Sequence, residues 1–261
     1  MSEKLNIAFI QPSLKWEDAV ANRALFSEEI QKISDEVDLI ILPEMFTTGF
    51  SMNAENLAEE TEAETLAWMR KHAKEKDCAI TGSVIITENA NYYNRLFFVF
   101  PDGSYKLYDK RHTFTLAKED ETYTAGTKRL IVNYQGWKIC PLVCYDLRFP
   151  VWARNTEDYD LLIYVANWPE KRVFAWDSLL RARAIENMSY CIGVNRTGED
   201  GDGYVYNGHS AVYDALGKEL TELDRSDEFV TQLSIDKGSL KEVREKLKFL
   251  QDRDKFNLLD E

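Results

Sequence analysis

The sequence is poor in histidine, with only His72, His112 and His209 in 261 residues, and these three lie far apart. So few histidines are poor material for a zinc site or for a cysteine–histidine catalytic pair. The four cysteines, at positions 78, 140, 144 and 191, include no CxxC pair. The spacing of potential ligands therefore predicts no metal site.

Long apolar runs are also missing. The N-terminal stretch MSEKLNIAFIQPS has one basic residue and only the short run IAFI, without the apolar core of a signal peptide. No window approaches the roughly 18 apolar residues that cross a bilayer. We therefore expect a cytoplasmic protein that does not enter membranes, and a reducing cytosol argues against disulfides.

Basic residues are too few to favour nucleic acid as a partner. The 32 Lys and Arg residues are outnumbered by 45 Asp and Glu, and the net charge of −13 repels phosphate backbones. The glycine-containing stretch GEDGDGYVYNGH (198–209) matches neither GxGxxG nor GxxxxGK[ST]. We expect it to be a surface loop beside a cleft, and we expect no cofactor.

The first part of the sequence alternates apolar strands with amphipathic helices. We predict strands over 5–11, 37–45 and 78–86, and helices over 17–34 and 63–76. The strands are continuously apolar, which is typical of a sheet covered on both faces. This pattern indicates an α/β protein.

The remainder adds hairpins to the same alternation. The predicted segments are hairpins in 93–110, around 135–136 and in 208–220, strands over 159–169, 190–198 and 228–236, and helices over 172–188 and 239–250. No repeat or linker divides the chain, so residues 1–261 are predicted to form a single domain. A mixed sheet, or two sheets packed face to face, would have its helices outside.

Three reactive side chains stand at or just past predicted strand ends, where ligands tend to bind in α/β proteins. Glu44 closes the apolar run LIILP, so burial should raise its pKa toward the range used in proton transfer. Lys110 ends the strand in LYDKRHTF. Cys144 ends the strand in CPLVCYDLRFP, where turn N–H groups can lower a thiol pKa and hold an oxyanion. Cys140 lies inside that strand and is expected in the core.

Taken singly, each of these residues could be structural, Glu44 and Lys110 at the surface and Cys144 as a buried thiol. No histidine is suitably placed to activate Cys144. A cysteine–glutamate–lysine group would do the same work, because the lysine stabilises the thiolate and oxyanion while the glutamate takes and returns the proton.

The segments LPEMFTTGF, DKRHTF and LVCYDLRFP resemble, in this order, the three signature segments of the nitrilase superfamily of carbon–nitrogen hydrolases. The resemblance runs over nearly the whole chain, including IAFIQPSLKW, ANWP and RARAIEN. It implies a four-layer α-β-β-α sandwich, a homodimer, and a catalytic triad of Glu44, Lys110 and Cys144.

The resemblance also implies a second glutamate and a mechanism. Glu119 stands seven residues before Gly126 in EDETYTAG, at the spacing seen in the superfamily, and is preferred to its competitor Glu121. Cys144 would attack an amide carbon and form a thioester, while Lys110 and the backbone N–H of Tyr145 would stabilise the oxyanion. Glu44 would transfer protons, and Glu119 would hold Lys110 and the substrate amide.

Within the superfamily, ANWP, RARAIEN and NRTGEDGDGYVYNGHS resemble the omega-amidase branch. That branch hydrolyses the terminal amide of short dicarboxylic monoamides such as 2-oxoglutaramate and 2-oxosuccinamate. An arginine suits the far carboxylate best. The candidates are Arg111, Arg148, Arg172 and Arg196. Arg148 could equally be a structural ion-pair partner.

Phe46, Tyr145 and Trp168 are candidate walls of the substrate pocket, although simple core packing would explain each of them equally well. Two other functions stay open. One is a different superfamily hydrolase, namely a carbamoylase, aliphatic amidase or nitrilase. The other is a non-catalytic binding protein, against which the intact triad argues.

Overall fold

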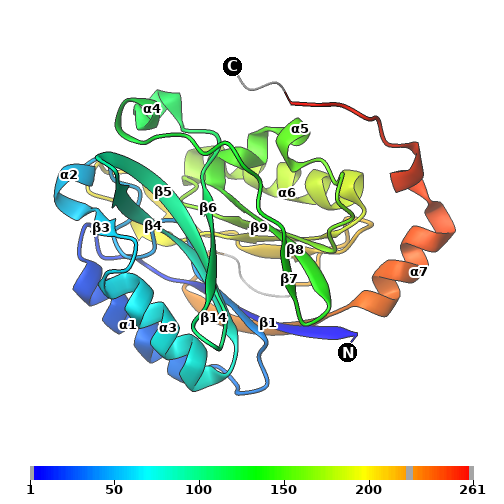
Figure 1. Ribbon diagram of the computed structural model, residues 1–261, viewed down its shortest axis with the longest axis horizontal. Helices are drawn as coiled ribbons and strands as arrows, with labels where there is room; N and C mark the ends of the chain where they lie inside the picture. The colour runs from blue at the N-terminus through cyan, green and yellow to red at the C-terminus, as the bar shows by residue number, and fades with distance from the viewer. Residues whose placement is uncertain (1–2, 222–225, 259–261) are drawn as a thin grey trace.

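The computed structural model describes residues 3–221 and 226–258 of the predicted 1–261 domain, and the remaining residues lie outside this description. Two β-sheets lie face to face, with α1 and α3 outside one sheet and α5 and α6 outside the other (Figure 1). The expected four-layer α-β-β-α sandwich is thereby confirmed. No helix in the described ranges combines the length and apolar character needed to cross a membrane.

The first sheet has the strand order β14-β1-β2-β4-β5-β6, with the short β3 paired to β4. β1, β2 and β4 are parallel, whereas β14, β5 and β6 run antiparallel to their neighbours. The strands are β1 (Lys4–Gln11), β2 (Leu39–Ile41), β3 (Glu59–Glu60), β4 (Ala79–Glu88), β5 (Asn91–Val99), β6 (Tyr105–Asp109) and β14 (Phe229–Asp236). The strand predicted over 37–45 is thus only three residues long, and Glu44 lies in the turn that follows it.

The second sheet has the order β13-β10-β9-β8-β7, with β8, β9 and β10 parallel. Its strands are β7 (Val132–Tyr134), β8 (Trp137–Val143), β9 (Leu161–Val165), β10 (Tyr190–Val194) and β13 (Ala211–Tyr213). The hairpin predicted in 208–220 is reduced to β13 and a single bridge from Tyr213 to Glu219. The predicted loop 198–209 overlaps the small ribbon of β11 (Thr197–Glu199) and β12 (Val205–Asn207).

The described residues form seven α-helices, four of which (α1, α3, α5 and α6) cover the outer faces of the sheets (Figure 1). They are α1 (Ala19–Gln31), α2 (Ala54–Leu57), α3 (Glu64–Lys76), α4 (Glu119–Thr122), α5 (Pro150–Ala153), α6 (Val173–Asn187) and α7 (Lys237–Leu247). Side chains on β1 alternate between two cores, as the period of a strand requires. Ile7 and Phe9 pack between the sheets, whereas Ala8 and Ile10 pack in the cluster that includes α1 and α3 residues.

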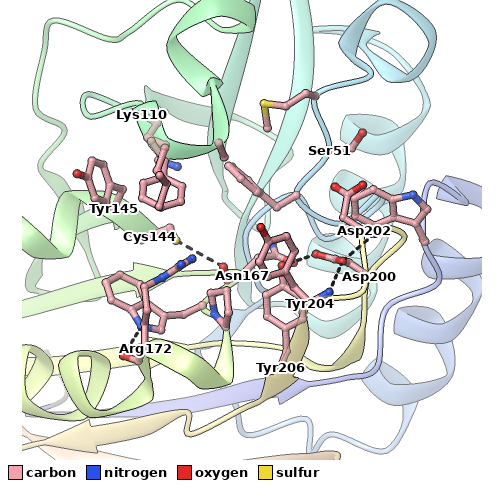
Figure 2. A pocket seen from close by; sticks show the side chains of 18 of the residues that line it. Ser51, Lys110, Cys144, Tyr145, Asn167, Arg172, Asp200, Asp202, Tyr204 and Tyr206 are labelled. Atoms are coloured by element: carbon pink, nitrogen blue, oxygen red, sulfur yellow. Dashed lines mark hydrogen bonds between the residues drawn. The ribbon is translucent and has the colours of Figure 1, made fainter.

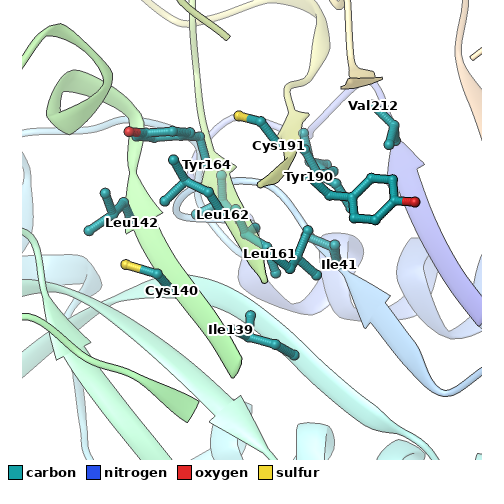
Figure 3. Packing of buried hydrophobic residues seen from close by; sticks show 14 of the residues in the cluster. Ile41, Ile139, Cys140, Leu142, Leu161, Leu162, Tyr164, Tyr190, Cys191 and Val212 are labelled. Carbon is teal, nitrogen blue, oxygen red and sulfur yellow. The ribbon is translucent and has the colours of Figure 1, made fainter. Parts of the chain in front are cut away.

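The hydrophobic core holds Cys140, as predicted. Cys140 and Cys191 are fully buried among Ile139, Leu142 and Leu162 (Figure 3). Full burial of an apolar side chain stabilises a fold by about 1.5–3 kcal/mol. The strands that contribute to this core end at the candidate site.

Candidate active site

The three predicted strand-end residues come together although they belong to both sheets. Glu44 follows β2 and Lys110 follows β6 of the first sheet, while Cys144 follows β8 of the second. Lys110 and Cys144 border the same pocket in Figure 2. Face-to-face packing of the sheets therefore builds the site.

Glu44 is fully buried, with donors on both carboxylate oxygens. Its Oε1 accepts from Lys110 Nζ at 2.9 Å and from Asn94 Nδ2 at 2.8 Å. Its Oε2 accepts from the backbone N–H of Asn167 at 2.8 Å. These bonds compensate for burial of the charge and hold the carboxylate in one orientation.

Lys110 also donates to Glu119, from Nζ to Oε2 at 2.8 Å and to Oε1 at 2.9 Å. Burial by itself would lower the pKa of Lys110, because it disfavours the charged ammonium. The Glu119 and Glu44 carboxylates have the larger combined effect, and the pKa of Lys110 is raised. Burial raises the pKa of Glu119, and Lys110 opposes that change. Glu121 is exposed and lies 3.6 Å from Lys118 Nζ, so the structure brings Glu119, not Glu121, to Lys110.

Cys144 begins the 3-10 helix η2 (Cys144–Arg148) with a φ of 43°, which is strained for a residue with a side chain. Its Sγ lies 3.9 Å from the carbonyl oxygen of Asn167. Burial and then the Glu44 charge raise the pKa of the thiol well above its usual value, and Lys110 only partly opposes them. The expectation that the turn would lower this pKa is therefore wrong, because burial and a nearby carboxylate dominate.

Two asparagines that were not predicted from the sequence hold the carboxylates. Asn94, inside β5, donates from Nδ2 to Glu44 and also to Glu119 Oε1 at 3.3 Å. Asn167 donates its side-chain amide to the carbonyl oxygen of Glu44 at 2.6 Å. Asn167 had a signal, since it follows the apolar strand β9 in ANWP, just as the triad residues follow their strands. Asn94 had only the weak signal of a polar residue in an apolar strand.

Cys144 opens into a cavity of about 540 Å³. Phe50, Phe114, Tyr145 and Trp168 contribute aromatic walls, and the Phe50 ring lies 5.1 Å from Lys110 Nζ. In Figure 2, Lys110, Cys144, Tyr145 and Arg172 lie on one side of the pocket, and Asp200 and Asp202 lie on the other. The two sides of the pocket therefore differ in charge.

Two of the four candidate arginines line this cavity. Arg148 stacks at 4.8 Å over Trp168, and Arg172 at 5.0 Å over Phe114. Neither forms an ion pair with any residue in 3–221 or 226–258. Both guanidinium groups can therefore bind a substrate carboxylate. The alternative prediction, that Arg148 forms a structural ion pair, does not hold among the described residues.

The other two arginines are committed elsewhere. Arg111 donates to the carbonyl of Gly126 at 3.2 Å and does not line the cavity. Arg196, expected to contact substrate, is fully buried and donates to the carbonyls of Thr197, Leu14 and Glu199. The expectation that Arg196 binds substrate is therefore corrected. Its guanidinium holds loop backbone and does not line the cavity.

Phe46 also lies outside the pocket. Its ring packs against Phe26 at 5.4 Å and Trp68 at 5.7 Å, in the core beneath α1 and α3. The interpretation of Phe46 as a substrate wall is corrected to core packing. Tyr145 and Trp168, the other two candidates, do line the cavity.

Known proteins resemble this chain over most of its length. The family model described as carbon-nitrogen hydrolase matches residues 6–245. The chain is 44% identical to omega-amidase YafV of Yersinia enterocolitica, over 98% of this chain and 99% of that protein. It is 36% identical to 2-oxoglutaramate amidase of Bacillus subtilis (strain 168), over 85% and 87%.

A solved structure has nearly the same fold. XC1258 from Xanthomonas campestris, a CN-hydrolase superfamily protein with an arsenic adduct in its active site, superposes with a TM-score of 0.96 at 43% identity. The match covers 99% of this chain and 100% of that one.

Proposed function

Because the chain belongs to the carbon–nitrogen hydrolase family, whose members hydrolyse non-peptide C–N bonds, we propose that it is an omega-amidase. It releases ammonia from the terminal amide of short dicarboxylic monoamides of the 2-oxoglutaramate or 2-oxosuccinamate type. One observation carries the proposal. Cys144 borders a cavity that also contains the buried Lys110 and two guanidinium groups without ion-pair partners in the described ranges.

The first half of the reaction forms a thioester. The Cys144 sulfur bonds to the amide carbon as its proton passes to Glu44, and the carbonyl oxygen becomes an oxyanion. Lys110 Nζ and the backbone N–H of Tyr145 stabilise that oxyanion. Glu44 then donates the proton to the nitrogen, the C–N bond breaks, and ammonia leaves.

The second half consumes water. Glu44 removes a proton from the water as its oxygen attacks the thioester carbon, and the C–S bond breaks as the proton returns to sulfur. The carboxylic acid is released and Cys144 is again a thiol. Atoms and charge balance over the cycle, and no cofactor takes part.

The charges in the site explain why a base is needed. Glu44 and Glu119 share the single ammonium of Lys110, so the group already has one excess negative charge. A resting thiolate would add another in a buried place, which is consistent with the raised pKa of Cys144. The proton therefore leaves sulfur only as the substrate oxygen takes up negative charge beside Lys110.

Arg148 and Arg172 supply the specificity for a carboxylate-bearing amide. A guanidinium binds a carboxylate with paired hydrogen bonds. The opposite side of the cavity, with Glu17, Asp200 and Asp202, repels a carboxylate. A dicarboxylic monoamide therefore binds with its acid end toward the arginines and its amide at Cys144.

A substrate panel with ammonia detection tests this function. We expect turnover of 2-oxoglutaramate and 2-oxosuccinamate to exceed that of an uncharged aliphatic amide, an N-carbamoyl amino acid and a nitrile by at least ~10-fold in kcat/KM. Preference for the carbamoyl compound or the nitrile would favour another hydrolase of the family. An acyl adduct on Cys144, detected by mass spectrometry, would exclude the non-catalytic alternative.

We further propose that the protein is a cytoplasmic homodimer. Exposed apolar side chains on and near α6, namely Val151, Phe174, Ile185 and Leu216, support a partner surface there. The four cysteines are free, which suits a reducing compartment. Sedimentation of the purified protein at twice the monomer mass is the expected result, and a monomer at micromolar concentration would contradict it.

A further inference from the structure

Asp146, two residues after Cys144, is a fully buried carboxylate with hydrogen-bond partners on both oxygens. Its Oδ2 accepts from the Tyr108 hydroxyl at 2.7 Å and the Val143 backbone N–H at 3.0 Å. Its Oδ1 accepts from the His112 backbone N–H at 3.0 Å and contacts His112 Nδ1 at 2.8 Å. These contacts on both oxygens hold the side chain of Asp146 in one orientation.

The donors flank the catalytic residues. Val143 directly precedes Cys144, whereas Tyr108 and His112 stand two residues before and two residues after Lys110. One carboxylate therefore ties the end of β8 in the second sheet to the end of β6 in the first. The positions of Cys144 and Lys110 relative to each other depend on this junction.

The His112 ring reinforces the junction. It lies flat on Phe149, with ring centroids 3.6 Å apart and an interplanar angle of 2°. Phe149 immediately follows η2, the turn that begins at Cys144. Since Asp146 Oδ1 is a carboxylate oxygen, His112 Nδ1 carries the proton in this contact. His112 thus contacts the Cys144 turn twice, through Asp146 and through Phe149.

We propose that Asp146 and His112 form a positioning pair that sets the Lys110 ammonium at the place where it stabilises the oxyanion formed on attack by Cys144. Neither residue touches the reacting atoms. The effect on kcat can be measured only if the proposed omega-amidase function is right, so this proposal rests on that function. Displacement of catalytic groups by about 1 Å costs on the order of 100-fold in rate, so loss of the junction should lower kcat.

Two substitutions of His112 separate its hydrogen bond from its ring stacking. His112→Phe keeps an aromatic ring on Phe149 and removes the Nδ1 donor. His112→Asn keeps a donor near the Nδ1 position and removes the ring. We expect kcat to fall ~10- to 100-fold in His112→Phe with KM within about threefold of wild type, and His112→Asn to recover most of kcat.

His209 provides the matched control. Its Nδ1 lies 3.0 Å from Asp177, and its side chain is 20% exposed, against 21% for His112. His209→Asn should leave kcat within about twofold of wild type. If His112→Phe behaves like this control, or if His112→Asn loses as much kcat as His112→Phe, the positioning role is wrong.

Alkylation of Cys144 by iodoacetamide supplies a readout that needs no amide substrate. Lys110 favours the thiolate, so its displacement in His112→Phe should slow alkylation ~10-fold while His112→Asn stays near wild type. Equal alkylation rates in wild type and His112→Phe would overturn the proposal even if the omega-amidase function holds. A change in alkylation without any turnover of omega-amides would reject only the function.

Tyr108→Phe tests the same carboxylate if His112→Phe does not fold. It removes the hydroxyl donor to Asp146 and keeps the ring. We expect the same loss in kcat and alkylation, and no loss of either would overturn the proposal.

Discussion

Asn167 and Glu44 hold each other through two hydrogen bonds. The Asn167 backbone N–H donates to Glu44 Oε2 at 2.8 Å, and its side-chain amide donates to the Glu44 carbonyl oxygen at 2.6 Å. Glu44 follows β2 of one sheet and Asn167 follows β9 of the other. Glu44, the proposed general base, is therefore oriented by a contact between the two sheets.

Asn167→Ala should break half of this contact. The backbone bond remains, but the buried Glu44 carbonyl loses its partner, which costs about 1–3 kcal/mol. We expect a matching loss in the free energy of unfolding by urea, together with a fall in kcat of ~10-fold or more. Unchanged kcat in a destabilised variant would show that Asn167 supports only the fold.

Cys144→Ala should abolish turnover and leave the fold intact, because no other described cysteine reaches the cavity. Cys140→Ala is the matched control. Cys140 is fully buried in the core, and burial raises the pKa of its thiol to about 12. We expect near-wild-type kcat for that variant by ammonia release. Robust hydrolysis by Cys144→Ala would disprove the assignment of the nucleophile.

Glu119→Gln should lower kcat by ~100-fold or more, because Lys110 Nζ loses its ion pair with Glu119 and the neutral amide cannot accept both of the hydrogen bonds that position the ammonium. Glu121→Gln, two residues away on the exposed side of α4, should be within about twofold of wild type. Steady-state kinetics on one omega-amide compare the two. The reverse order of effects would make Glu121 the second glutamate.

Arg172→Gln should raise KM for 2-oxoglutaramate ~10- to 100-fold, because the substrate carboxylate loses a charge-assisted hydrogen bond. An uncharged aliphatic amide is the matched control substrate, and its kcat/KM should change by less than about threefold. The same experiment on Arg148→Gln apportions binding between the two guanidinium groups. Equal losses on both substrates would indicate a structural role for the arginines.

Alkylation of Cys144 in the free enzyme should increase with pH. Burial and Glu44 raise the pKa of this thiol, so the reactive thiolate is the minor form at neutral pH. Its fraction should grow ~10-fold per pH unit between pH 7 and 9 without a plateau. Iodoacetamide rates followed by mass spectrometry measure this, with Cys144→Ala as the background. A plateau below pH 7 would mean a resting thiolate.

Much of the architecture could be predicted because it depends on local periodicity. The apolar runs that became β1, β4 and β9 and the amphipathic stretches that became α1, α3 and α6 were all found, with errors at their ends. One large error was the strand over 37–45, of which only Leu39–Ile41 pairs. Residues after Ile41 remain apolar but turn out of the sheet, and an apolar run alone does not reveal where pairing stops.

The sequence by itself determined which three residues are proposed to carry the chemistry, since Glu44, Lys110 and Cys144 each follow a strand and stand in recognisable segments. Only the tertiary structure decided which other residues join them. Asn94 and Asn167 form hydrogen bonds with the glutamates of the site. Arg148 and Arg172 line the pocket, whereas Arg196 and Phe46 are buried outside it. The physical reason is that burial and side-chain contact arise from the packing of two sheets against each other, and residues that meet there are remote in the chain.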